Sequence, residues 1–240
     1  MTSRGRRRLC IDSPGLIGKV GAGVSIAVID SGVNPNHPHV GDVAGAVRIE
    51  LTGSRSADYV DRMGHGTAVY AAIQEKAKGA DLHAVRVFDD KLSTSTRALV
   101  AAIHWAAEQR VMLANLSLGT AKTGHALALG EAVAKLSEVG GVVVAAAESD
   151  GQRWWPGSLD GAIGVVMDPE CPRDCIELRH GHFAGSPFHR PIPGVPPERN
   201  LNGISFAVAN VTGVLARLLE GYDGVLTSAS ILDRARGVAG

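Results

Sequence analysis

The segment Val24-Ser25-Ile26-Ala27-Val28-Ile29-Asp30-Ser31-Gly32 carries the strongest signal for the fold class of this chain of 240 residues. Its short run of β-branched and small apolar residues is typical of a strand buried on both faces of a parallel sheet. Similar runs are found at residues 82–87, 112–118, 142–147 and 163–167. Patterns with helical spacing alternate with them, at residues 67–78, 95–109 and 127–139. This alternation predicts an α/β fold with a doubly wound, mainly parallel sheet and helices on both faces.

The size and composition of the chain fit one large domain. Apolar residues make up 45% of the sequence and aromatic residues only 4%, so small aliphatic side chains must fill the core. We expect an N-terminal tail over residues 1–20 and a single domain over residues 21–240. The proline-rich stretch 168–202 predicts a long ordered loop or short edge strands, since it lacks helical or strand periodicity.

The charge balance excludes some classes of partner. Lysine plus arginine and aspartate plus glutamate each number 24, so the formal net charge is zero, which argues against a general nucleic-acid or membrane-surface binder. No segment has the ~18 apolar residues that a membrane span needs. Residues 10–15 interrupt the apolar stretch that a secretory signal requires after a basic start, and we therefore expect a cytoplasmic protein.

The cysteines allow several interpretations. Three cysteines, an odd number, do not suggest a disulfide framework. Cys171 and Cys175 lie close together, with His180, His182 and His189 nearby, so this segment fits a metal site, a loop disulfide or a pair of free thiols. A cytoplasmic location favours free thiols. We expect no bound metal and no cofactor.

Three segments carry candidate catalytic residues. Ser205 lies in Asn202-Gly203-Ile204-Ser205-Phe206-Ala207 and opens an apolar helical run, His65 lies in Gly64-His65-Gly66-Thr67, and Asp30 closes the first strand. A serine hydroxyl becomes a strong nucleophile when an imidazole takes its proton, and a buried carboxylate orients that imidazole. The order Asp, His, Ser is one of the orders in which such triads occur.

Each of these residues also has a structural interpretation. Serine is a favoured cap at a helix start, so Ser205 would satisfy free backbone N–H groups there. His65 would be a buried histidine bonded to backbone, and Asp30 would form a turn after its strand. The presence of all three motifs favours the catalytic interpretation.

Together the motifs resemble those of the subtilisin-like serine peptidases, the subtilases, from about residue 20 to about residue 220. Ile29-Asp30-Ser31-Gly32-Val33, His65-Gly66-Thr67-Ala68 and the segment around Ser205 are similar to the three catalytic motifs. The resemblance implies a subtilisin-like fold that acts on a peptide or protein substrate, with Ser205 as nucleophile, His65 as general base and acid, and Asp30 as orienting carboxylate. It also implies substrate-binding roles for Leu116, Ser117, Leu118, Gly119, Ala146 and Glu148.

The chain departs from the family pattern at several positions. Glu148-Ser149 stands where the family usually has Gly-Asn, whose asparagine stabilises the oxyanion, so we expect a weaker role for Ser149. Ile204 replaces the usual threonine. Glu148 and Asp150 would favour a basic residue before the scissile bond. A calcium-ligating aspartate of relatives is replaced by His39, so no calcium is expected there.

These observations predict a serine endopeptidase that works through an acyl-enzyme, with a dedicated intracellular role such as leader removal. The departures near the oxyanion site keep two alternatives open, a peptide-binding pseudo-enzyme and a transamidating macrocyclase. The sequence predicts no nucleic-acid or membrane partner and leaves the oligomeric state unspecified.

Overall fold

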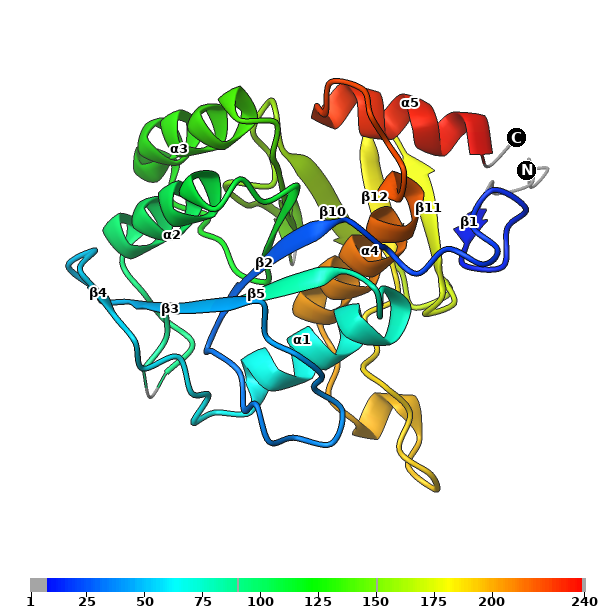
Figure 1. Ribbon diagram of the computed structural model, residues 1–240, viewed down its shortest axis with the longest axis horizontal. Coiled ribbons are helices and arrows are strands. Elements are labelled where there is room, and N and C mark those ends of the chain that lie inside the picture. The colour runs from blue at the N-terminus through cyan, green and yellow to red at the C-terminus, as the bar shows by residue number, and fades with distance from the viewer. Residues whose placement is uncertain (1–7, 90, 150, 239–240) are drawn as a thin grey trace.

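The computed structural model describes residues 8–89, 91–149 and 151–238 of the chain, without the side chain of Ser149 (Figure 1). Ten strands form one sheet in the order β1-β11-β12-β10-β7-β6-β2-β5-β3-β4, and β8 and β9 form a separate hairpin. In chain order the strands are β1 Arg8–Cys10, β2 Ser25–Asp30, β3 Gly45–Ile49, β4 Arg55–Ser56, β5 Asp81–Arg86, β6 Leu113–Leu116, β7 Val142–Ala146, β8 Glu148–Ser149, β9 Gln152–Arg153, β10 Ile163–Met167, β11 Cys175–Arg179 and β12 His182–Gly185.

All strands from β12 across to β3 run parallel, while β11 and β1 on one edge and β4 on the other are antiparallel to their neighbours. The helices are α1 His65–Lys76, α2 Thr96–Glu108, α3 Ala126–Glu138, α4 Ile204–Leu219 and α5 Ser228–Val238, with 3-10 turns η1 Thr123–His125 and η2 Pro197–Arg199. The doubly wound, mainly parallel sheet expected from the sequence is therefore confirmed.

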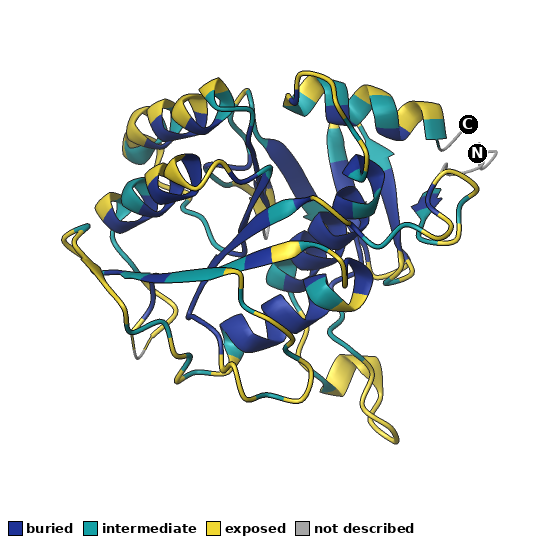
Figure 2. Cartoon of the chain, viewed as in Figure 1, coloured by how far each residue is buried: buried dark blue, intermediate teal, exposed yellow. Residues whose placement is uncertain are grey.

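The sheet separates two hydrophobic cores because successive side chains of a strand point to opposite faces. In β2, Ile26 and Val28 pack with α1, α4 and α5, whereas Ala27 and Ile29 pack with α2 and α3. Figure 1 shows α2 and α3 together on their side of the sheet. In Figure 2 the centre of the sheet and α4 are dark blue, since both are enclosed by other elements. This enclosure explains why α4 is apolar around almost its whole circumference.

The N-terminal segment is part of the domain from Arg8 onward. β1 pairs antiparallel with β11, and the side chains of Leu9 and Leu16 are buried. The expected tail over residues 1–20 is therefore wrong for residues 8–20, and residues 1–7 lie outside the described part of the chain. The stretch 168–202 contains β11 and β12, which agrees with the short edge strands that were one of its two predicted forms.

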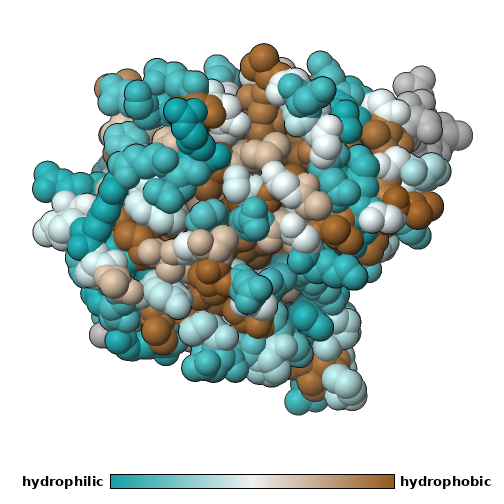
Figure 3. Space-filling model, viewed as in Figure 1, coloured by the Kyte–Doolittle hydropathy of each residue, from teal (hydrophilic) through white to brown (hydrophobic). Residues whose placement is uncertain are grey.

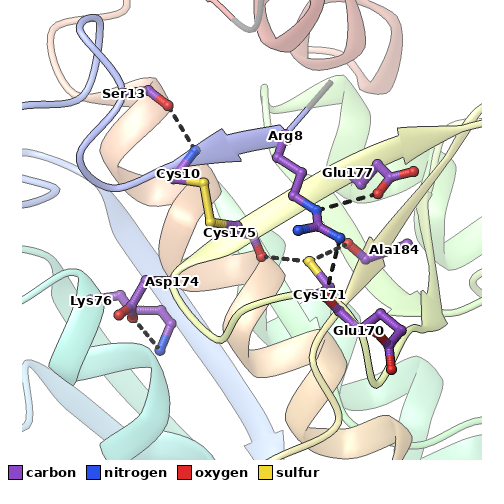
Figure 4. Close-up of a disulfide and its surroundings, with 10 residues drawn as sticks. All are labelled: Arg8, Cys10, Ser13, Lys76, Glu170, Cys171, Asp174, Cys175, Glu177 and Ala184. Carbon is purple, nitrogen blue, oxygen red and sulfur yellow. Dashed lines mark hydrogen bonds and ion pairs between the residues drawn. A yellow bond between two sulfur atoms is a disulfide. The ribbon is translucent and has the colours of Figure 1, made fainter. Parts of the chain in front are cut away.

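Cys10 and Cys175 form a disulfide across the β1–β11 pair, as Figure 4 shows. The expectation of free cysteines is wrong for these two, and Cys171 is the buried free thiol. Local spacing could not reveal the bond because its partners are 165 residues apart and meet only through strand pairing. Burial raises the pKa of Cys171 to about 11, so its thiol is unreactive.

Figure 3 shows polar and apolar side chains interspersed over one face. Across the described ranges, no helix combines the length and apolar character that a membrane crossing requires. The same residues contain no group of three or more His, Cys, Asp or Glu side chains arranged to hold a metal ion. The expectation that calcium is absent stays a prediction.

Candidate active site

Asp30 and His65 meet at the carboxyl end of the parallel sheet, where α/β proteins commonly form their sites. β2 ends at Asp30 and α1 begins at His65, and their Oδ1 and Nδ1 atoms lie 2.7 Å apart. Asp30 is fully buried, and its Oδ1 also accepts a hydrogen bond from the Ser31 N–H at 2.7 Å. Since the carboxylate accepts the Nδ1 proton, Nε2 of a neutral His65 carries the lone pair that a base needs.

Two glycines allow this meeting. Gly32 has a φ of 97°, and a Cβ there would lie 2.2 Å from the Tyr59 carbonyl oxygen. A Cβ on Gly66 would lie 2.3 Å from the Gly32 carbonyl oxygen. The backbones after Asp30 and after His65 therefore touch directly, which explains physically why both residues are followed by nearby glycines.

Asp61 organises the loop that presents His65. Its Oδ1 accepts hydrogen bonds from the Met63 and Gly64 N–H groups and from the Ser31 hydroxyl, at 2.8, 2.9 and 2.9 Å. Its Oδ2 accepts from the N–H and the hydroxyl of Thr67, at 2.8 and 2.6 Å. Asp61 was not among the residues predicted from the sequence, although an acidic side chain just before a helix start is a known signal.

The environment of His65 shifts its basicity in opposite directions. Burial of the ring lowers its pKa, whereas the hydrogen bond and charge of Asp30 and the charge of Asp61 raise it. The raising causes prevail, and the pKa of His65 lies above the ordinary histidine value. The Asp30–His65 contact thus favours the imidazolium that forms when the ring accepts a proton.

Ser205 lies in the first turn of α4 and is bound to the end of β6. Its hydroxyl donates to the Ser117 carbonyl oxygen at 3.0 Å, and the Ser117 hydroxyl donates to the Ser205 carbonyl oxygen at 3.3 Å. Among the described residues, no hydrogen bond joins Ser205 to the His65 ring. The capping interpretation of Ser205 is wrong, because the cap of α4 is Gly203 and no side chain bonds to the free N–H groups of that turn.

A buried polar network holds the Ser117–Ser205 contact. The Asn115 amide donates to the Ser117 hydroxyl at 3.0 Å and accepts from the Thr212 hydroxyl of α4 at 2.9 Å. Asn115, Ser117 and Thr212 are all buried, so these bonds fix the start of α4 against β6. The ring of Phe206, the residue after Ser205, lies with its centroid 5.9 Å from that of His65, so the start of α4 lies near the Asp30–His65 pair.

The start of α4 also offers a donor for an anion. Within the described chain the Ser205 N–H has no acceptor, as is usual for the first N–H groups of a helix. Such N–H groups favour negative charge. Ser149, the second expected donor, belongs to β8 opposite Gln152, but its side chain lies outside the described structure.

The expected substrate-binding residues surround the carboxyl ends of β6 and β7. Leu116 ends β6 and Ala146 ends β7, and both are buried. Leu118 and Gly119 follow β6 without a backbone hydrogen bond to other described residues, so this short edge is free to pair with an extended peptide. Glu148 is exposed in the β8–β9 hairpin, where it lies opposite Arg153.

Comparisons with known proteins agree with this architecture. The model of the subtilase family matches residues 21–167, a range that contains Asp30 and His65 and ends before Ser205. Subtilisin E of Bacillus subtilis (strain 168) is 30% identical over 249 aligned residues, which cover 92% of this chain and 62% of that protein. The minor extracellular protease Epr of the same organism is 35% identical over 143 residues, covering 56% of this chain and 21% of Epr.

Solved structures show the same fold. A cold adapted subtilisin-like serine proteinase has a TM-score of 0.68 and 25% sequence identity, and the match covers 90% of this chain and 82% of that one. Sphericase has a TM-score of 0.69 with 23% identity and the same coverage, a likeness of fold. The chain spans less than two thirds of the length of Subtilisin E and of Epr.

Proposed function

Because this chain belongs to the subtilase family, we propose that it is a serine endopeptidase that hydrolyses peptide bonds of a peptide or protein substrate through an acyl-enzyme. The observation that carries the proposal is the 2.7 Å contact between buried Asp30 and His65, beside the helix start that presents Ser205. A purely structural role for His65 would not explain why the unpaired edge at Leu118 and Gly119 lies next to Ser205, whose backbone N–H has no acceptor within the described chain.

The chemistry follows from the positions of these groups. The Ser205 hydroxyl leaves the Ser117 carbonyl by rotating about its Cα–Cβ bond and donates its proton to His65 Nε2 as its oxygen bonds to the scissile carbonyl carbon. The tetrahedral intermediate collapses when His65 returns that proton to the leaving amine nitrogen and the C–N bond breaks. Water then repeats the sequence on the acyl-enzyme, releasing the acid and regenerating Ser205.

The oxyanion site limits the expected rate. The Ser205 N–H supplies one donor, and the asparagine of the family pattern is replaced by Ser149. Loss of one such donor raises the barrier by about 3–4 kcal/mol, a value measured in subtilisin itself. We therefore propose a slow or specialised peptidase, consistent with a dedicated processing role such as leader removal.

The proposed substrate lies in extended form along Leu118 and Gly119. The residue before the scissile bond then extends toward the ends of β6 and β7. Glu148 supports a preference for a basic side chain there, although Arg153 opposite it in the hairpin weakens the local negative field.

A peptide-binding pseudo-enzyme is the second candidate, and the resting position of Ser205 favours it. In this position the hydroxyl is bonded to the Ser117 carbonyl oxygen, and no serine among the described side chains bonds to the His65 ring. The same groove would then bind an extended peptide without cleaving it. A transamidating macrocyclase would share the acyl-enzyme and differ only in the amine that replaces water.

A fluorophosphonate probe tests the nucleophile. We expect the wild-type chain to be labelled, Ser205→Ala to remain unlabelled, and the control Ser137→Ala on α3 to be labelled normally. Mass spectrometry of peptide products then separates hydrolysis, which adds water, from macrocyclisation, which does not. Peptide binding without any labelling of a folded wild-type chain would contradict the peptidase and favour the pseudo-enzyme.

The Cys10–Cys175 disulfide bears on the cellular compartment of the protein. Disulfides such as Cys10–Cys175 are rare in the reducing cytosol and common in secreted proteins. The bond therefore supports an oxidising compartment instead of the cytoplasmic location expected from the sequence.

A further inference from the structure

A pocket of about 450 Å³ lies beside the start of α1, where it is lined by Gly64 and Thr67 on either side of His65 in the chain. Three segments form its walls, which are the loop after β2, the start of α1 with the residues before it, and the loop that leads to Ser205. The side chains that matter for its chemistry are Asn34, His37, His39, Arg62, His189 and Leu201. None of these residues belongs to the expected substrate-binding set.

The polar groups of this pocket are mainly hydrogen-bond donors. Asp61 is the carboxylate among its described lining residues, and both oxygens of Asp61 already accept hydrogen bonds from the groups that hold the His65 loop. The His37 Nδ1 accepts the His39 N–H at 3.2 Å, so a neutral His37 carries its proton on Nε2, where it is a donor. The rings of His37 and His39 pack edge to face with centroids 5.2 Å apart.

The remaining members complete a donor-rich wall. Asn34 accepts the Asn36 N–H with its Oδ1, and its amide N–H groups have no acceptor among the described residues. Arg62 bonds to Asp58 through one nitrogen and keeps its other donors. Burial lowers the pKa of His189 to about 4, so this ring is neutral and serves as an uncharged wall with Leu201. Together these groups suit an anion with two acceptor oxygens.

The position of the pocket matches the leaving segment of a substrate. His65 delivers its proton to the leaving amine, so that part of the substrate must pass the His65 ring. The pocket is lined by Met63 and Gly64, directly before His65, and by none of residues 116–119, where the acyl segment is proposed to lie. The substrate residues that follow the scissile bond would therefore lie in this pocket.

Resting on the proposed peptidase function, we propose that the pocket formed around His37, His39 and Arg62 binds a carboxylate on the leaving-group side of the scissile bond. That carboxylate belongs either to a Glu or Asp side chain within the first three residues after the cut or to the C-terminus of a substrate cut near its end.

Peptides that differ only after the cut test this specificity. One series has Glu, Gln or Lys at each of the first three positions after the scissile bond. A second series ends at the third position as the free acid or the amide, which distinguishes the two sources of the carboxylate. We expect kcat/KM to be roughly tenfold higher for the carboxylate peptide than for its neutral partner, the effect of one charge-assisted hydrogen bond.

Pocket variants assign the preference to these residues. His37→Ala and His39→Ala should bring the ratio of carboxylate to neutral peptide toward one, while His104→Ala, a change of an exposed histidine of α2, should leave it unchanged. Equal kcat/KM for both peptides, or a preference that survives both pocket variants, would overturn the inference.

The same peptides separate this inference from the proposed function. Their affinity for Ser205→Ala is measured by fluorescence anisotropy, which requires no turnover. If no peptide is cleaved but the carboxylate peptide binds more tightly to this variant, the peptidase proposal fails and the pocket inference stands. Equal affinities for the carboxylate and neutral peptides would end the pocket inference.

Discussion

Breaking the Cys10–Cys175 disulfide should remove a large part of the stability of this fold. The bond joins residues 165 positions apart, so it excludes many extended conformations of the unfolded chain. A cross-link of that length lowers the entropy of the unfolded chain by roughly 17 cal/mol/K in the loop-closure model, or about 5 kcal/mol at 25 °C. Because domains are stable by only about 5–15 kcal/mol, this is a substantial share of the total.

Guanidinium unfolding, followed by circular dichroism, measures the effect. The wild-type chain is compared with and without a reductant, and with the double variant Cys10→Ala/Cys175→Ala. We expect reduction and the double variant to lower the midpoint by similar amounts, on the order of 1 M. Cys171→Ala is the control, since it removes a buried thiol without opening a loop.

Two results would show that the entropy argument does not hold. One is a midpoint that is the same in oxidised and reduced protein. The other is alkylation of three thiols in the purified, unreduced chain, because the bond would then be absent. A midpoint lowered as much by Cys171→Ala as by the double variant would attribute the loss to core packing.

Two further predictions concern ionisation. In the proposed mechanism His65 acts as a base in its neutral form, so kcat/KM should rise with pH through a pKa above the ordinary histidine value. Asp30→Asn removes a cause that raises this pKa, so it should move the midpoint of the pH profile to lower pH. The same variant should reduce activity by about 10⁴-fold. An unchanged midpoint would exclude Asp30 as the cause. Burial lowers the pKa of Lys76 to about 8, so the unfolded chain binds more protons between about pH 8 and 10.5, and the free energy of unfolding should rise over that interval. Lys76→Met should remove that rise and raise the free energy of unfolding at pH 7 by up to roughly 3 kcal/mol, as urea titrations at several pH values would show.

The central sheet could be predicted because its signals are local. A strand buried on both faces needs a short apolar run, and the runs that end at Asp30 and at Ala147 provide it. The edge strands β1 and β11 gave no such signal, since each is stabilised by its partner strand and by the Cys10–Cys175 bond across them. Pairing between segments so far apart in the sequence has no local signature.

The same contrast holds for the candidate site. The motifs predicted that Asp30 and His65 would meet, because the carboxyl end of a strand and the start of the next helix lie at one edge of the sheet. They did not predict the Ser117–Ser205 contact or the role of Asp61, which depend on side-chain geometry in three dimensions. The motifs do not predict a complete oxyanion site, because Ser149 stands where the family usually has asparagine.

Two features of the site oppose turnover, the hydrogen bond that holds Ser205 on the Ser117 carbonyl and the missing oxyanion donor, and their free energies differ. Releasing Ser205 from the Ser117 carbonyl breaks one neutral hydrogen bond, which is worth about 0.5–1.5 kcal/mol and costs at most roughly a factor of ten in rate. A missing oxyanion donor costs about 3–4 kcal/mol, or roughly 10²- to 10³-fold. The resting position of Ser205 is therefore compatible with the proposed peptidase activity, and in the proposed mechanism the donor opposite the Ser205 N–H determines the rate. Ser149→Asn should consequently accelerate turnover more than any change at Ser117, because only the former restores a transition-state contact.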